Sequence, residues 1–159
     1  MTKYLFAPPE VKSIAIRGRG EQFPIRRIFC VGRNYEAHAR ELGMEVDREA
    51  PFFFTKAAIN SIPSGATIPY PPGTANYQHE MELVVGIGKA GFRIPESQAL
   101  EYVFGYACGL DMTRRDLQIQ AREKKLPWDI GKDFENAAVL SEIAPAAKIG
   151  HPGRARIEL

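Results

Sequence analysis

Hydrophobic and polar positions along this chain of 159 residues alternate over short stretches that glycine and proline interrupt. Alternation with a period of two predicts β-strands, and the interruptions predict turns. Turn residues separate the first two expected strands, so these form a strand–turn–strand unit. The expected strands cover residues 13–16, 27–31, 52–56, 80–85 and 103–110. The run at residues 52–56 is apolar without alternation, so we expect a buried strand there.

Short helices are expected between these strands and after them. Asn34 is a suitable N-cap for a helix over residues 35–42. A second short helix is expected within residues 95–102. Thr113 resembles the N-cap of a third helix, which continues to Lys125.

The composition is that of a globular protein, with 45% hydrophobic and 25% charged residues. The length allows one core. We expect an N-terminal segment with short strands over residues 1–23, followed by the main domain over residues 24–159. Residues 155–159 begin an alternating strand pattern without a partner after it, which favours a chain truncated at its C-terminus.

Charge and cysteine content restrict the partners and the compartment. The chain has 21 basic and 19 acidic residues spread along its length, so nucleic acid is not an expected partner. The N-terminus lacks an apolar run long enough for a signal peptide or a membrane span. Cys30 and Cys108 lie in apolar segments, which favours buried free thiols. We therefore expect a cytoplasmic protein without a membrane partner.

Three carboxylates form a candidate metal site. Glu80 and Glu82 lie two residues apart on an expected strand, so they share one face. Asp111 stands at the end of another strand. Three carboxylates completed by water and substrate oxygens suit Mg²⁺ or Mn²⁺. Spacing alone leaves two other interpretations open, a solvated strand face for the glutamates and a helix-terminal charge for Asp111.

Side chains at helical spacing add candidate catalytic and binding groups. His38 and Glu41 lie three residues apart, so the carboxylate could orient the imidazole as a general base. Arg115 and Gln118 have the same spacing and could bind a substrate oxygen. Lys132 could stabilise a developing enolate. Solvent-exposed surface positions are the open alternative for each of these residues.

Four separated motifs then occur in order along the chain. They are Gly32-Arg33-Asn34-Tyr35 with His38 and Glu41, His79-Glu80-Met81-Glu82-Leu83, Gly105-Tyr106 with Asp111-Met112-Thr113-Arg114-Arg115-Asp116-Leu117-Gln118, and Gly131-Lys132-Asp133-Phe134. In order and spacing, they resemble the fumarylacetoacetate hydrolase family. Residues 51–56 and 111–118 are most similar to members that hydrolyse fumarylpyruvate in the gentisate pathway. Four motifs in register are more specific than any one of them.

The resemblance implies a mixed β (α+β) fold, a β-roll with short peripheral helices, in which residues 24–159 are the catalytic domain. It also implies the role of each candidate residue. The implied metal ligands for Mg²⁺ or Mn²⁺ are Glu80, Glu82 and Asp111. The implied catalytic residues are His38, Glu41 and Lys132, and the implied substrate contacts are Arg33, Arg115 and Gln118.

The implied reaction is hydrolysis of a carbon–carbon bond in an acylpyruvate such as fumarylpyruvate, which yields fumarate and pyruvate. A homodimer or higher homo-oligomer is expected by the same resemblance. Oxaloacetate decarboxylation and isomerisation of a dienoate are alternatives for the same site. A non-catalytic oligomerising or binding domain is a third alternative. Val31 replaces an additional acidic ligand of the longer members, and the family members continue past the position of Leu159.

Overall fold

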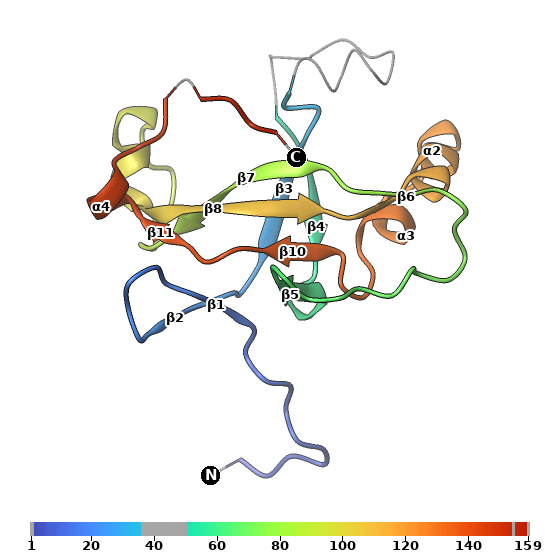
Figure 1. The fold of residues 1–159 in the computed structure, drawn as a ribbon, viewed down its shortest axis with the longest axis horizontal. Helices are drawn as coiled ribbons and strands as arrows, with labels where there is room; N and C mark the ends of the chain where they lie inside the picture. The colour runs from blue at the N-terminus through green and yellow to red at the C-terminus, as the bar shows by residue number, and fades with distance from the viewer. Residues whose placement is uncertain (1, 36–50, 154, 159) are drawn as a thin grey trace.

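The computed structural model describes residues 2–35, 51–153 and 155–158. Short strands predominate, and the helices lie at the periphery (Figure 1). The strands are β1 (Ser13–Ala15), β2 (Gln22–Pro24), β3 (Ile28–Gly32), β4 (Phe52–Lys56), β5 (Ser61–Pro63), β6 (Tyr77–Gln78), β7 (Met81–Ile87), β8 (Val103–Asp111), β9 (Thr113–Arg114), β10 (Ala138–Leu140) and β11 (Ala144–Pro145). The helical elements are η1 (Ala58–Asn60), η2 (Glu96–Tyr102), α2 (Arg115–Glu123), α3 (Asp129–Lys132) and α4 (Ala146–Ile149). Within the described ranges, no helix is long and apolar enough to cross a membrane.

Strand β8 is the centre of the main sheet because it pairs along both edges (Figure 1). β7 lies antiparallel along one edge, while β10 and β11 lie antiparallel along the other. β5 joins β10 in parallel. A Cβ atom at Gly105 would lie 2.3 Å from the Ala144 carbonyl oxygen, so glycine allows β11 to approach β8. Mixed sheets with short peripheral helices agree with the expected fold class.

One face of the β7–β8–β10 sheet changes character along its length. Val84 on β7 packs against an apolar cluster at one end of this face. The buried members of this cluster are Ile14, Ile16, Ala107, Leu140 and Ile143. At the other end, where α2 and α3 lie in Figure 1, the same face carries the three candidate carboxylates. The sheet therefore supports a core and a polar site with the same strands.

A second apolar cluster covers the opposite side of β10. Its buried members are Met112, Phe134, Ala137 and Val139. Because the two clusters enclose β10 from both sides, Ala138, Val139 and Leu140 are all buried. This strand anchors the end of β8 that carries Asp111.

The β3–β4 hairpin confirms two expected strands but not their burial. Lys56 pairs with Ile28, and Phe52 pairs with Gly32. We expected β4 to be buried as an apolar strand, yet Phe53 is 54% exposed whereas Lys56 is 3% exposed. The expectation was wrong because the lysine end of β4, not its phenylalanine end, reaches the polar site.

Two local predictions about pairing and capping were wrong. The strand at residues 13–15 pairs with β2, which the sequence did not indicate, and not with residues 27–31. Thr113 belongs to β9 and does not cap α2, because its hydroxyl donates to the Asp111 carbonyl oxygen at 3.1 Å. Helix α2 begins at Arg115 without a side-chain cap.

The cysteines and the C-terminal segment also differ from expectation. Both cysteines are free, but Cys108 is exposed because it lies opposite Leu83 on the outer face of the sheet. Cys30 is half-buried. Residues 155–158 form no strand.

Candidate metal centre and adjoining pocket

The register of β7 on β8 brings the three candidate carboxylates together. Backbone hydrogen bonds join Glu80 and Asp111 in both directions, at 2.9 and 3.2 Å, so the two residues stand directly opposite each other. Directly opposite residues share a face, and Glu82 follows two positions later on that face. One oxygen from each of the three carboxylates lies within 4.8 Å of the others. The predicted cluster therefore exists in the fold.

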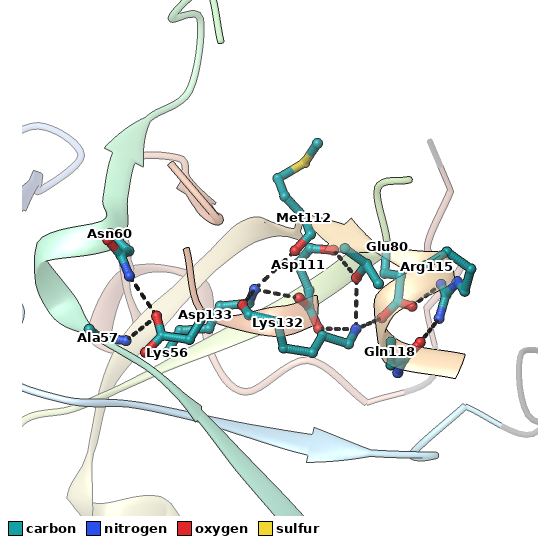
Figure 2. Close-up of polar contacts among 11 residues, drawn as sticks. Lys56, Ala57, Asn60, Glu80, Asp111, Met112, Arg115, Gln118, Lys132 and Asp133 are labelled. Carbon is teal, nitrogen blue, oxygen red and sulfur yellow. Dashed lines mark hydrogen bonds and ion pairs between the residues drawn. The ribbon is translucent and has the colours of Figure 1, made fainter. Parts of the chain in front are cut away.

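Lys132 bridges two of these carboxylates (Figure 2). Its Nζ donates to Glu80 Oε2 at 2.7 Å, to Asp111 Oδ2 at 2.8 Å and to Thr113 Oγ1 at 2.8 Å. The short helix α3 places this lysine by packing against α2. A Cβ at Gly131 would lie 2.7 Å from the backbone nitrogen of Gln118, so only glycine fits this contact. With 2% exposure, Lys132 is not one of the surface lysines that its sequence context left open.

Arg115 holds Glu80 from the side opposite Lys132. Its Nη2 forms an ion pair with Glu80 Oε1, and its Nη1 donates to Gln118 Oε1 (Figure 2). Nε donates to Gln78 Oε1 at 2.8 Å. These three contacts fix the guanidinium plane, so Arg115 orients Glu80. Gln118 also lines the cavity beside the carboxylates.

Lys56 belongs to the same cluster, and sequence reasoning assigned it no role. Its Nζ lies 2.8 Å from Asp111 Oδ1 and donates to the carbonyl oxygens of Met112 and Lys132. Burial lowers the pKa of this amine, and the Asp111 carboxylate partly offsets that effect. A single lysine at the end of the apolar run 52–56 was the only signal in the sequence.

The electrostatic environments of the two glutamates differ. Burial would raise the pKa of Glu80, but the positive charges of Lys132 and Arg115 outweigh burial and lower it to about 2. For Glu82, burial and the negative charges of Asp111 and Glu80 raise the pKa to about 7. Glu82 accepts a hydrogen bond from Tyr35, whose hydroxyl oxygen accepts from the Leu83 N–H at 3.2 Å. Of the two glutamates, Glu82 is therefore the one whose ionised form would gain more from another nearby cation.

The donor set fits a divalent metal ion. Three carboxylates offer the oxygen ligands that Mg²⁺ and Mn²⁺ prefer. Asp111 Oδ1 is buried beside the Lys56 ammonium, whose Nζ lies 2.8 Å away. The carboxylates open on a cavity of about 40 Å³, which has room for an ion and a water molecule or two at roughly 10–15 Å³ for each water.

Of the remaining candidate residues, the structure describes Arg33 but not His38 or Glu41. Arg33 lines the cavity of the carboxylates and a larger cavity beside it. Its guanidinium lies over the Phe52 ring, 5.6 Å from the ring centroid. His38 and Glu41, and the helix expected over residues 35–42, lie outside the described residues beyond position 35. The catalytic and substrate-binding roles of all these residues remain predictions.

The fold and the carboxylate cluster define the class of protein. The family model described as fumarylacetoacetate (FAA) hydrolase C-terminal matches residues 27–159, and the chain belongs to this family. Particular relatives refine the comparison. A fumarylpyruvate hydrolase from Ralstonia sp. is 58% identical over 106 residues, which are 65% of this chain and 55% of that protein. The mitochondrial oxaloacetate tautomerase FAHD1 of Arabidopsis thaliana is 41% identical over 126 residues, or 79% of this chain and 56% of that protein.

A solved structure has the same fold. The crystal structure of fumarylpyruvate hydrolase from Pseudomonas aeruginosa, in complex with Mn²⁺ and pyruvate, aligns with a TM-score of 0.89 and 52% sequence identity. The alignment covers 94% of this chain and 66% of that chain. The chain thus spans about half to two thirds of the length of these relatives. The expected family and its mixed β fold are confirmed.

Proposed function

We propose that this chain carries the metal-binding part of an acylpyruvate hydrolase, with fumarylpyruvate as its substrate. The observation that supports this proposal most directly is the convergence of Glu80, Glu82 and Asp111 beside the buried amine of Lys132. The similarity to two fumarylpyruvate hydrolases, at 58% and 52% identity, favours this substrate over other acylpyruvates.

Each described residue at the site has a proposed task. Glu80, Glu82 and Asp111 would hold Mg²⁺ or Mn²⁺, which when bound polarises a keto oxygen and stabilises enolate charge. Arg115 keeps Glu80 in position. The Lys132 ammonium adds a fixed positive charge where negative charge develops during bond cleavage, an effect that commonly contributes several kcal/mol.

The water-activating step is assigned to His38, oriented by Glu41. In this proposal the imidazole accepts a proton from water, and the oxygen of that water adds to the ketone carbonyl of the acyl group. The bond between this carbonyl carbon and the methylene carbon then breaks, and its electron pair leaves as pyruvate enolate. Protonation of the enolate carbon completes the reaction of fumarylpyruvate and water to fumarate and pyruvate.

Keto–enol tautomerisation of oxaloacetate is the second candidate function. The 41% identity to an oxaloacetate tautomerase favours it, and the same cation and lysine would stabilise the enolate. This reaction moves a proton without hydrolytic water. Oxaloacetate decarboxylation, dienoate isomerisation and a non-catalytic binding domain remain the broader alternatives.

Parallel assays separate these functions. In one assay the native protein with Mn²⁺ or Mg²⁺ receives fumarylpyruvate, and the fumarate and pyruvate formed are measured. In the other it receives oxaloacetate, and the rate of keto–enol equilibration is measured. We expect fumarate and pyruvate in equal amounts, and loss of both in His38→Ala but not in the matched control His151→Ala. Tautomerisation without cleavage would support the second function. Absence of turnover and of metal uptake would support a binding domain.

The biological setting follows as part of the proposal. We propose a cytoplasmic homodimer or higher oligomer that acts in aromatic-compound catabolism, in the gentisate pathway. Native mass would test the oligomeric state, substrate-dependent growth would test the pathway, and cell fractionation would test the compartment.

A further inference from the structure

A second cavity of about 560 Å³ adjoins the carboxylate cluster. Its lining comes mainly from β4 and from the segment that joins α2 to α3. Both cavities share the lining residues Arg33, Phe54, Arg122, Trp128 and Lys132. A ligand held at the carboxylates can therefore extend into the larger space without leaving the protein surface. This volume lies within the usual range of roughly 300–1,000 Å³ for small-molecule sites.

One wall of this larger cavity is aromatic. The rings of Phe52 and Trp128 meet edge to face with centroids 5.0 Å apart, and Phe54 lies 5.9 Å from Trp128. Flat rings that are fixed against one another offer a surface for a planar, unsaturated chain.

The rim of the cavity is basic. Its lining includes four basic side chains and one acidic side chain, Asp129. The basic residues are Arg33, Arg122, Lys125 and Lys132. Lys132 donates hydrogen bonds to Glu80 and Asp111, whereas Lys125 is exposed and lies just after the C-cap of α2. An excess of cations in a cleft attracts an anionic group.

The backbone supports the functional importance of two of these cations. Arg33 has φ 57° and Lys125 has φ 55°, a left-handed conformation that favours glycine. They are two of the four non-glycine residues with positive φ in the described part of the chain. Backbone strain of this kind is concentrated at functional sites, which favours a role for these two side chains.

We propose that this cavity is a subsite for a second carboxylate, at the end of the substrate remote from the metal centre. This inference rests on the proposed function and adds the residues that select fumarylpyruvate, whose acyl chain is planar, unsaturated and ends in a carboxylate. The chain lies along the Phe52–Trp128 wall. Lys125 and Arg33 bind its terminal carboxylate.

The test compares two substrates that differ only at that end. Fumarylpyruvate carries the terminal carboxylate, and crotonylpyruvate has a methyl group in its place. We expect the native Mn²⁺-loaded protein to favour fumarylpyruvate in kcat/KM. In Lys125→Gln this preference falls by roughly tenfold, mainly through KM, because one charge-assisted hydrogen bond is lost. Lys124→Gln, which changes the adjacent lysine outside the cavity, is the matched control and retains the preference.

A second variant separates the subsite from folding. Lys125→Gly places glycine in the left-handed position, so we expect equal or higher thermal stability together with the same loss of preference. An equal preference in all three variants would overturn the subsite.

Binding measurements keep this test independent of turnover. Fumarate and crotonate are titrated into the Mn²⁺-loaded protein by calorimetry. Tighter fumarate binding that Lys125→Gln abolishes supports the subsite, even if neither acylpyruvate is hydrolysed and the proposed reaction fails. Equal affinity for the two acids, or a fumarate preference that Lys125→Gln leaves intact, would overturn it.

Discussion

The two ends of one sheet face of this protein have opposite physical character. At one end, Val84 on β7 packs on the cluster that contains Leu140 and Ile143. At the other end, a short distance along the same strand, Glu82 faces Glu80 and Asp111. Apolar burial favours folding at the first end, whereas the second end buries charged groups of both signs, and burial penalises the charged form of each. One end therefore supports the fold, and the other is the end at which we propose that a cation binds.

The largest effect is expected at the apolar end. Ile143 is fully buried, so Ile143→Ala should lower the free energy of unfolding by about 3–4 kcal/mol, through lost burial and a new cavity. Urea unfolding measures this change. Mn²⁺ affinity of the folded variant should be unchanged, because the carboxylates lie at the other end of the face. Ile149→Ala, at a 52% exposed position, is the control with little expected effect. Loss of Mn²⁺ affinity in folded Ile143→Ala would show that the ends are not independent.

At the polar end, the effect is expected on metal binding and not on folding. Glu82→Gln keeps the shape of the side chain and removes a ligand charge, so Mn²⁺ affinity should fall on the order of a hundredfold. The metal-free variant should be no less stable at pH 8, because a like charge is removed from Asp111 and Glu80. Calorimetric titration and thermal unfolding measure the two quantities. Glu96→Gln, at an exposed position in η2, is the matched control. Unchanged Mn²⁺ binding in Glu82→Gln would remove this residue from the ligand set.

The Mn²⁺ affinity of the polar end is expected to depend on pH. Burial, Asp111 and Glu80 raise the pKa of Glu82 to about 7, so below that pH the residue is protonated and cannot ligate a cation. Mn²⁺ affinity should therefore rise about tenfold from pH 6 to pH 8, with release of a proton. The dependence should disappear in Glu82→Gln.

The stability of the metal-free protein should depend on pH in the opposite sense, falling where the Mn²⁺ affinity rises. Folding raises the pKa of Glu82, so the folded state binds more protons between the ordinary value of 4.5 and about 7. The stabilising contribution of the neutral carboxyl is present at acid pH and is lost as the pH rises through about 7. Unfolding measured with a chelator present checks the sign. Affinity for Mn²⁺ that falls with rising pH would contradict this account of Glu82.

The smallest effect is expected on the outer face of β7. Leu83 is 48% exposed, so Leu83→Thr should change the free energy of unfolding by less than about 0.5 kcal/mol. Val84→Thr, one position along the strand, places a hydroxyl against the apolar cluster and should cost about 1 kcal/mol or more. Urea unfolding of both variants gives the contrast. A larger loss in Leu83→Thr would mean that the outer face is covered in the native assembly.

Local patterns in the sequence predicted much of the framework. Strands β3, β4, β7 and β8 lie where short apolar runs and period-two alternation predict them. The prediction that Glu80 and Glu82 share a face follows because successive side chains on a strand point to opposite faces. Four motifs in register identified the family, which the matched residues 27–159 confirm.

Burial and long-range contacts could not be derived in this way. Alternation separates Leu83 from Val84 but does not say which of them faces the core, and the structure exposes the leucine. The role of Lys56 depends on contacts with Asp111 and Met112, which are distant in sequence. Thr113 resembled a helix cap because that motif is local, yet Asp111 and Lys132 engage its hydroxyl.

The sequence by itself determined which residues alternate along each strand and which motifs the chain shares with its family. Only the tertiary structure decided that Asp111 stands opposite Glu80, that two buried lysines hold it there, and that a basic, aromatic-walled cavity adjoins them. The physical reason is that alternation is a property of consecutive residues. Register, burial and charge pairing depend instead on the packing of distant segments against one another.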